Sequence, residues 1–241
     1  MFEELQNTTL SPYLSVALRH SFRSLTVHVR FELTQPWTIL FGPSGSGKTT
    51  ILRAIAGLLT PQWGFIRLRR GVETTLFDSD AAVNLAPHRR RTPLSPQLPA
   101  LFPHLDVRGN LEYAGGKVEN HAAAFGTEHL LNRMPAQLSG GEAQRVSLAR
   151  ASLTVRPRLL LLDEPFTGLE LPLRDELMDR LRHWQDETEV PILSVTHDVV
   201  EALRLQADVV KLQNGSIVAQ GPAADVLKEE RAGLLSQLQG E

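Results

Sequence analysis

Apolar and polar residues alternate regularly in the first part of the chain. Over residues 14–35 most apolar side chains recur at every second position, and this period of two predicts antiparallel strands with one face in water. An apolar strand is expected at 37–41, where it runs into a glycine-rich turn, and a helix is expected at 49–56. Residues 63–77 have the pattern of a further hairpin.

The second half of the chain alternates apolar runs with amphipathic segments. Before it, residues 86–137 are rich in Pro, Gly, Asn and His and contain only short helical stretches, so we interpret them as an inserted helical lobe. After this lobe the expected order is helix 140–152, strand 159–163, helix 171–187, strand 191–196, helix 198–205 and strand 208–212, then a turn at Asn214-Gly215. Strands that alternate with helices predict a parallel sheet covered by helices on both faces.

Composition narrows the class of protein without changing this picture. The 241 residues are 42% hydrophobic and 22% charged, which is ordinary for a globular protein, and the length fits one large domain or one domain with a lobed insertion. The net charge of −2 supplies no global field that would draw the chain to nucleic acid or to an anionic membrane. Because the chain has no cysteine, disulfides and cysteine-ligated metal sites are excluded.

No segment of the sequence has the layout of a secretory signal or a membrane span. The first residues, Met1-Phe2-Glu3-Glu4, are acidic and lack the basic-then-apolar order of a signal peptide. The densest aliphatic run, Leu159 to Leu162, is far shorter than the roughly 20 residues that cross a bilayer. We therefore expect a cytosolic chain that reaches a membrane only through a partner.

A glycine-rich loop stands between the strand at 37–41 and the helix at 49–56. It matches the pattern G-x-x-x-x-G-K-[ST] with the residues Gly42, Pro43, Ser44, Gly45, Ser46, Gly47, Lys48 and Thr49. The glycines let backbone N–H groups converge on phosphate oxygens, and the following helix adds its positive end. We expect Lys48 to reach the β- and γ-phosphates and Thr49 to bind Mg²⁺, with Thr50 also in the nucleotide site. An ordinary glycine-rich turn is the alternative, but the position between a strand and a helix argues against it.

A second candidate feature is a pair of acids at the end of a buried strand. Four leucines precede Asp163 and Glu164. This order places both carboxylates at the carboxyl end of the strand, where open α/β sheets bind ligands. We expect Asp163 to hold Mg²⁺ and Glu164 to act as the general base that polarises the attacking water. A solvated strand end is the plainer alternative for an isolated Asp-Glu pair, and the phosphate loop upstream argues against it.

The octapeptide Leu138-Ser139-Gly140-Gly141-Glu142-Ala143-Gln144-Arg145 resembles the signature of the ABC ATPase family, and the other motifs follow in family order. The resemblance covers about residues 14–225. It implies an α/β fold with a P-loop NTPase (RecA-like) core, an N-terminal antiparallel β subdomain and an inserted α-helical subdomain. The core would comprise 1–90 and 151–241, and the signature subdomain 91–150. The resemblance further implies an ATP hydrolase coupled to transport, with ATP and Mg²⁺ as cofactors.

The same resemblance assigns roles to residues outside the first two motifs. Ser139, Gly140 and Gly141 would cap the γ-phosphate held by the phosphate loop of an opposite chain, so that two chains bury two ATP molecules between them. Gln97 would sense the Mg²⁺ ion, as one of its ligands, and the attacking water. His197 would bind the γ-phosphate and hold that water in place.

Four positions are weaker or depart from the family pattern. Phe22 resembles the residue that stacks on adenine, although an aromatic residue in a strand is more often part of a core, and Tyr13 is a weaker candidate. Pro96 stands where the family usually has an aromatic residue before the glutamine. Glu170 stands where the D-loop normally ends in Asp, and its longer side chain could loosen signalling across the dimer.

Within the family the chain most resembles the ATPase subunits of molybdate importers. The segments that indicate this are residues 41–50, 101–111 and 169–172, in particular Val107-Arg108-Gly109-Asn110-Leu111 followed by Tyr113. Importers of sulfate, tungstate and polyamines share much of this pattern and stay open as alternatives, and a non-transport ABC ATPase is a further one. Because the chain ends soon after Gly215, we expect no C-terminal oxyanion-binding regulatory domain.

The resemblance also implies partners and a location. A second copy of the chain would complete the ATP-binding homodimer, and transmembrane permease subunits would dock near Phe102 to Leu105. A periplasmic or extracellular substrate-binding protein would act indirectly. The chain would lie peripherally on the cytoplasmic side of the inner (plasma) membrane. The basic run His88 to Arg91 is interpreted as a solvated loop, so no nucleic-acid partner is expected.

Overall fold

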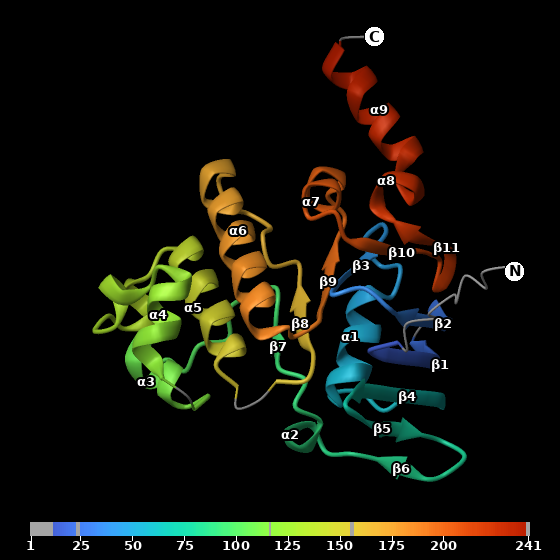
Figure 1. Cartoon of the computed structure of the whole chain (residues 1–241), viewed down its shortest axis with the longest axis horizontal. Helices are drawn as coiled ribbons and strands as arrows, with labels where there is room; N and C mark the ends of the chain where they lie inside the picture. Colours follow the sequence, from blue (N-terminus) through green and yellow to red (C-terminus); the bar gives the residue numbers. More distant parts are fainter. Residues whose placement is uncertain (1–11, 23–24, 116, 155–156, 240–241) are drawn as a thin grey trace, which may run out of the picture.

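A computed structural model describes residues 12–22, 25–115, 117–154 and 157–239 of the chain. Within these residues the chain forms two sheets with helices between and beside them (Figure 1). None of the described helices is long and apolar enough to cross a membrane. The α/β class expected from the sequence is confirmed.

The N-terminal sheet has the strand order β2-β1-β4-β5-β6, and every neighbouring pair is antiparallel. Its strands are β1 (Leu14–Phe22), β2 (Leu25–Leu33), β4 (Trp63–Arg70), β5 (Val72–Asp78) and β6 (Val83–Asn84). In β2 the apolar side chains from Val27 to Leu33 are buried and the residues between them are exposed, as a period of two requires. The predicted hairpins at 14–35 and 63–77 are therefore confirmed, whereas the short β6 was not predicted.

The second sheet has the strand order β11-β10-β3-β9-β8-β7 and is parallel except for β11. Its strands are β3 (Trp37–Phe41), β7 (Leu94–Ser95), β8 (Leu160–Asp163), β9 (Ile192–Thr196), β10 (Asp208–Gln213) and β11 (Ser216–Pro222). Successive leucines of β8 enter opposite cores, with Leu160 and Leu162 on one side and Leu161 on the other. Both faces of the central strands β3, β8 and β9 are thus buried, which is why these strands are mostly apolar, whereas the edge strand β11 is partly exposed.

Helix α1 (Lys48–Ala56) lies between the two sheets (Figure 1). Its Ile51, Leu52 and Ile55 are fully buried in one cluster that also contains strand residues of both sheets. The helix begins directly after the glycine-rich loop and ends at Gly57, whose φ of 81° is a left-handed cap. The burial of α1 on two sides therefore fixes where the glycine-rich loop stands.

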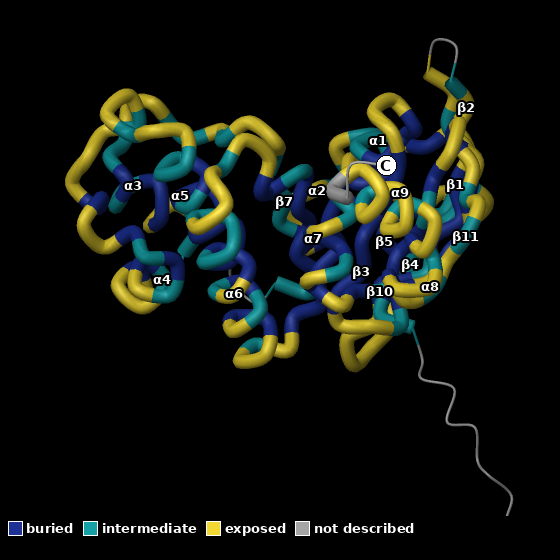
Figure 2. The backbone as a smooth tube through the Cα atoms, turned by 90° about the horizontal axis from the view of Figure 1, so that it is seen from above, coloured by how far each residue is buried: buried dark blue, intermediate teal, exposed yellow. Residues whose placement is uncertain are grey.

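The remaining long helices cover the other face of the six-stranded sheet or extend from it. In Figure 2 a lobe containing α3 (Val107–Glu112), α4 (Val118–Phe125) and α5 (Gly140–Ser152) stands beside the sheets. Residues of this lobe, of α6 (Leu171–Thr188) and of α7 (Val199–Arg204) share one core with the six-stranded sheet. The short α2 (Pro87–Arg90) and the C-terminal α8 (Ala223–Val226) and α9 (Lys228–Gln239) complete the described helices longer than one 3₁₀ turn.

The sheet extends into the range 91–150 that the sequence assigned to the helical subdomain. Leu94 and Ser95 form β7 and pair in parallel with Leu161 and Leu162 of β8. A strand of two residues is too short to show any hydrophobic period, so the sequence pattern could not mark it. The helical lobe of the structure consists of the elements that follow this strand.

The basic run His88 to Arg91 is exposed as expected at three of its positions, but its first residues belong to the short helix α2, and Arg90 is only 1% exposed. Its guanidinium donates to the carbonyl oxygens of Ala54 at 2.7 Å and Ile55 at 3.1 Å, and to that of Leu85 at 2.8 Å. The last carbonyls of a helix have no partner within the helix. Arg90 therefore caps the C-terminal end of α1 and joins it to the loop before α2.

Replacing Arg90 with Met should lower the free energy of unfolding by about 3 kcal/mol, because the buried carbonyl groups would lose their donor. Urea unfolding followed by circular dichroism measures this change. The matched control is Arg89→Met, on the same helix but exposed, which should change the free energy of unfolding by no more than about 0.5 kcal/mol. Equal effects of the two substitutions would contradict the capping role.

Candidate functional site

The glycine-rich loop joins β3 to α1 and is packed closely against both sheets. Gly42 has a φ of 154°, and a Cβ there would lie 2.3 Å from the carbonyl oxygen of Leu212 in β10. Gly47 has a φ of 104°, and a Cβ there would lie 2.5 Å from Cγ2 of Val27 in β2. Only glycine fits positions with these dihedrals and contacts. Close contacts with β10 and β2 therefore constrain the backbone conformation of the loop.

Lys48 is the first residue of α1 and is 5% exposed. Its Nζ donates to the carbonyl oxygens of Gly42 at 2.7 Å and Pro43 at 2.9 Å, so the side chain folds back over its own loop. Burial lowers the pKa of Lys48, whereas the nearby carboxylates of Glu164 and Asp163 oppose this by favouring the ammonium form. The loop thus presents a buried cation next to two acids.

Asp163 ends β8 and is 7% exposed. Its Oδ1 accepts a hydrogen bond of 3.1 Å from Oγ1 of Thr49. Burial raises the pKa of Asp163, and the hydrogen bond from Thr49 opposes that rise. A hydroxyl and a carboxylate side by side are oxygen ligands of the kind that Mg²⁺ takes in proteins. The structure thus brings together two of the three residues expected to bind the metal.

Glu164 is the centre of a hydrogen-bonded group that joins three loops. Its Oε2 accepts from Nε2 of Gln97 at 3.0 Å and from Oγ1 of Thr167 at 3.2 Å. Its Oε1 lies 3.5 Å from Nδ1 of His197. Glu164 also has a φ of 47°, a left-handed conformation that is uncommon for a residue with a side chain and that occurs more often at functional sites. The three residues expected to be catalytic therefore meet around one carboxylate.

A cavity of about 440 Å³ opens onto these residues, and its walls include Lys48, Thr49, Gln97 and Glu164. Phe22, expected to stack on adenine, is also in its wall and is 60% exposed. The weaker candidate Tyr13 packs instead against the core between the two sheets. Of the expected nucleotide-binding residues, Ser44, Gly45, Gly47 and Thr50 line this cavity as well.

The signature residues do not line this cavity. Ser139 is the N-cap of α5, where its Oγ accepts from the backbone N–H of Glu142 and its own N–H donates to Glu142 Oε2 at 2.8 Å. A Cβ added to Gly140 would meet nothing within 4 Å, and one added to Gly141 would lie 2.7 Å from Cδ2 of Leu173. The signature therefore caps a helix of the lobe and presents an open backbone at Gly140, separate from the Lys48 cavity.

The structure adds a network behind His197 that the sequence did not reveal. Asp198 caps α7 by accepting from the N–H groups of Val200 at 2.7 Å and Glu201 at 3.1 Å. Its other oxygen accepts at 2.7 Å from Arg174, in the first turns of α6. An N-cap Asp is a sequence signal that could have been found, but its partner on another helix has no such signal. The network ties the residue after His197 to the helix that follows the D-loop.

Glu201 is a buried carboxyl at the base of this network, 4% exposed. Its Oε2 accepts at 2.9 Å from Oγ1 of Thr196, which in turn accepts at 3.0 Å from the N–H of Asp198. The pKa of Glu201 is raised to about 8, chiefly by burial; the hydrogen bond from Thr196 opposes the rise, and the negative charge of Asp198 contributes to it. At neutral pH this carboxyl is therefore protonated, and Thr196 Oγ1 links it to the N–H of Asp198 on the other side of His197.

Sequence comparisons place the chain beside transport ATPases. A family model described as ABC transporter matches residues 27–167. A molybdate/tungstate import ATP-binding protein, WtpC of Archaeoglobus fulgidus, is 42% identical over 87% of this chain and 87% of its own length. A molybdenum import ATP-binding protein, ModC of Mesorhizobium japonicum, is 40% identical over 88% of this chain. The chain spans 59% of the length of that ModC and 62% of that of the ModC of Rhizobium meliloti.

Solved structures share the fold. The cbiO1 protein of Clostridium perfringens, described as part of an ABC transporter complex, has a TM-score of 0.77 at 24% identity, covering 94% of this chain and 95% of that one. An ATP-binding cassette solved as a dimer in a post-hydrolysis state with ADP and Pi has a TM-score of 0.70 at 25% identity. It covers 87% of this chain, and the match spans 98% of that cassette.

Replacing Glu201 with Gln should change how stability depends on pH. In the folded protein the pKa of Glu201 is about 8, against an ordinary value of 4.5, so folding takes up a proton between these pH values and the wild type loses stability as pH rises through that window. The variant has no such proton to take up. Its free energy of unfolding relative to wild type should therefore increase from pH 5 to pH 8, as urea unfolding at several pH values measures.

The matched control for this comparison is Glu229→Gln, an exposed carboxyl of α9. Its free energy of unfolding should run parallel to that of the wild type across the same pH range. A curve for Glu201→Gln that also stays parallel to wild type would contradict the protonated state of Glu201.

Proposed function

This chain belongs to the ABC transporter family, and from that membership we propose that it is the ATP-binding and ATP-hydrolysing subunit of an importer that carries molybdate through a separate permease. The proposed substrate is inferred from relatives at 40–42% identity, which are named molybdate/tungstate or molybdenum import ATP-binding proteins. The chain itself has no residue that is expected to touch the transported ion, so the substrate rests on this likeness.

The Lys48 cavity has the groups that a nucleotide with Mg²⁺ requires. Lys48 supplies a cation for phosphate oxygens, and the hydroxyl of Ser46 is buried in the same loop without a hydrogen-bond partner among the described residues. Thr49 and Asp163 form the oxygen pair for the metal, and Gln97 would add a third ligand. When bound, Mg²⁺ would neutralise negative charge on the phosphates. Phe22 lies in the cavity wall, where it would stack on the base.

Glu164 is placed to accept a proton from the attacking water. Its carboxylate already accepts hydrogen bonds from Gln97 and Thr167, which fix its orientation. His197 lies on the opposite oxygen of the same carboxylate, where it would hold the water and contact the terminal phosphate. A general base must lie within hydrogen-bonding reach of the proton that it removes, and these contacts direct the carboxylate toward the cavity.

One chain holds only part of this site, because Ser139, Gly140 and Gly141 lie outside the Lys48 cavity. We propose that a second copy supplies them, with the α5 N-terminus of each chain facing the bound nucleotide of the other. The dimeric cassette with ADP and Pi supports this arrangement. Backbone N–H groups at a helix N-terminus attract negative charge, so the signature would favour the triphosphate over the diphosphate.

The helical lobe carries the surface that we assign to the permease. Leu98 is 81% exposed and Tyr113 is 73% exposed, and the ring of Phe102 contacts that of Tyr113 with centroids 4.5 Å apart. Exposed apolar side chains beside the Gln97 loop are typical of a protein interface. The chain would then lie peripherally on the cytoplasmic side of the membrane, and a substrate-binding protein outside the membrane would deliver the ion.

The Glu164→Gln variant should form a dimer with ATP and Mg²⁺ and return to monomer with ADP and Mg²⁺. Removing the base stops hydrolysis but leaves the phosphate and metal ligands in place, so the ATP-bound dimer should persist. Light scattering coupled to size exclusion measures the mass in each nucleotide. A second variant that also carries Lys48→Ala serves as control and should stay monomeric. A monomer in both nucleotides would contradict a clamp built by this chain alone.

Copurification with a permease and reconstitution in vesicles, together with the substrate-binding protein, test the substrate. Molybdate should accelerate ATP hydrolysis, because a loaded binding protein drives the permease toward the state that closes the ATPase dimer. Tungstate, sulfate and a polyamine are tested in parallel as alternative substrates. Acceleration by sulfate or by a polyamine, and not by molybdate, would replace the proposed substrate while leaving the ATPase role intact.

A further inference from the structure

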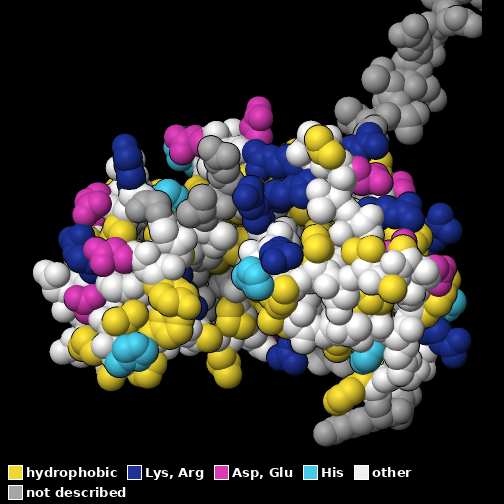
Figure 3. Space-filling view, turned by 90° about the horizontal axis from the view of Figure 1, so that it is seen from below, with side chains coloured by type: hydrophobic (Ala, Val, Ile, Leu, Met, Phe, Trp, Pro, Cys, Tyr) yellow, Lys and Arg dark blue, Asp and Glu magenta, His cyan; other side chains and the backbone are white. Residues whose placement is uncertain are grey.

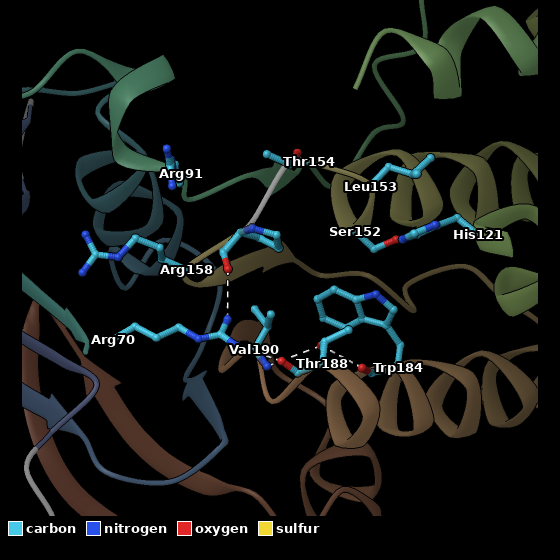
Figure 4. A pocket seen from close by; sticks show the side chains of 11 residues that line it. Arg70, Arg91, His121, Ser152, Leu153, Thr154, Arg158, Trp184, Thr188 and Val190 are labelled. Atoms are coloured by element: carbon cyan, nitrogen blue, oxygen red, sulfur yellow. Dashed lines mark hydrogen bonds between the residues drawn. The ribbon is translucent and has the colours of Figure 1, made fainter. Parts of the chain in front are cut away.

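A cavity of about 670 Å³ lies between the helical lobe and the sheets, apart from the Lys48 cavity (Figure 4). Its walls come from the end of β4, the end of α2, α4, the end of α5 and the end of α6. No residue is shared between the walls of the two cavities. Its volume is in the range of small-molecule sites, which is about 300–1,000 Å³.

The charged residues in the wall of this cavity are all basic. Arg70, Arg91 and Arg158 line it together with His121, and no Asp or Glu is among the described residues of the wall. None of these three arginines forms an ion pair within the described part of the chain. Burial lowers the pKa of Arg158, and the positive charges of Arg91 and Arg70 lower it further. The part of the wall that the structure describes therefore carries positive charge and no carboxylate. Figure 3 shows a cluster of Lys and Arg side chains on the face seen from below, with further Lys and Arg side chains elsewhere on that face.

Two of the arginines are held in place by neutral acceptors. Arg70 donates to the carbonyl oxygens of Pro157 at 3.0 Å and Thr188 at 2.8 Å, which orients its guanidinium across the cavity (Figure 4). Arg158 donates to Oγ1 of Thr74 at 2.7 Å and is turned toward the β4–β5 hairpin, so it contributes its charge and not a direct contact. Carbonyls orient a guanidinium without neutralising it, and each Arg has five N–H donors.

Arg91 is the free member of the set. It is exposed, and its side chain makes no hydrogen bond or ion pair in the part of the chain that the structure describes. A guanidinium of this kind can rotate to pair with a carboxylate or phosphate in the fork geometry that suits both. His121 bonds through Nδ1 to the carbonyl oxygen of Lys117, the N-cap of α4, at 3.2 Å.

The floor of the cavity is apolar. Leu153, Trp184 and Val190 are buried side chains in the wall. Trp184 is 4% exposed, so its large indole ring supplies a fixed apolar surface at the base of the cavity.

We propose that this cavity binds a small organic anion, with a phosphate, sulfonate or carboxylate group on Arg70 and Arg91 and an apolar or aromatic body against Trp184 and Leu153. The basic rim selects the charge, and the apolar floor favours an anion with a carbon body over a bare inorganic ion. A ligand in this place would touch both the helical lobe and the sheets, since its contacts come from both.

Calorimetric titration with 1-naphthyl phosphate tests this site, with the protein saturated with ADP so that the Lys48 cavity is occupied. We expect one additional binding event. Replacing Arg91 with Gln should weaken it about fivefold, as expected for one partly exposed charge-assisted contact. The matched control is Arg89→Gln, an exposed arginine of α2 outside the cavity wall, which should leave the affinity unchanged.

Three further measurements distinguish the contribution of the ligand's charge from that of its apolar body. Uncharged 1-naphthol should bind much more weakly than the phosphate ester, and inorganic phosphate alone should also bind more weakly. Affinity for the ester should fall as sodium chloride is raised, because salt screens the arginines. Absence of binding, or equal loss in the Arg91→Gln and Arg89→Gln variants, would overturn the proposal.

Discussion

The enclosure of α1 between two sheets is the constraint on which the rest of the site depends. Ile51, Leu52 and Ile55 are buried toward both sheets, so the helix has almost no freedom to rotate or slide. Arg90 holds its C-terminal end through the carbonyls of its last turn. The N-terminal end is thereby fixed next to β8, and Thr49 reaches Asp163 on a different element. The burial of the apolar side chains of α1 thus sets the positions of the polar groups at its N-terminal end.

Around this fixed end the groups that we propose to be catalytic meet at a single carboxylate. One carboxylate oxygen of Glu164 accepts hydrogen bonds from Gln97 and Thr167, and the other lies near His197. The segment of His197 is in turn held from behind, by Asp198 on Arg174 and by the neutral carboxyl of Glu201 on Thr196. Helix α6 follows the D-loop, and its Arg174 pairs with Asp198, the residue after His197. A movement of α6 would therefore also move His197 through this ion pair. This gives the D-loop a physical route to the catalytic centre within the same chain.

Two features for which we propose a binding partner from outside the chain lie at the boundary between the helical lobe and the sheets. The signature at the start of α5 presents an open backbone at Gly140 and has no nucleotide group beside it in its own chain. Near the other end of α5, the arginine-lined cavity carries unbalanced positive charge. Both depend on where the lobe stands relative to the sheets. Any partner that moves the lobe, whether a second copy or a permease, would change both.

The sequence by itself determined the longer elements and indicated the central groups. The period of two over 14–35, the apolar β3 and β8, and the loop ending in Lys48 and Thr49 are local patterns, and local patterns record which face of an element is buried. Motif order predicted roles for Glu164, Gln97 and His197, and only the structure showed that Gln97 and His197 both lie against the carboxylate of Glu164. Tertiary structure alone decided the burial of Arg90, the pairing of Arg174 with Asp198, the neutral state of Glu201 and the arginine-lined cavity. Each of these depends on residues that are distant along the chain, and their burial and partners arise only when separate elements pack together.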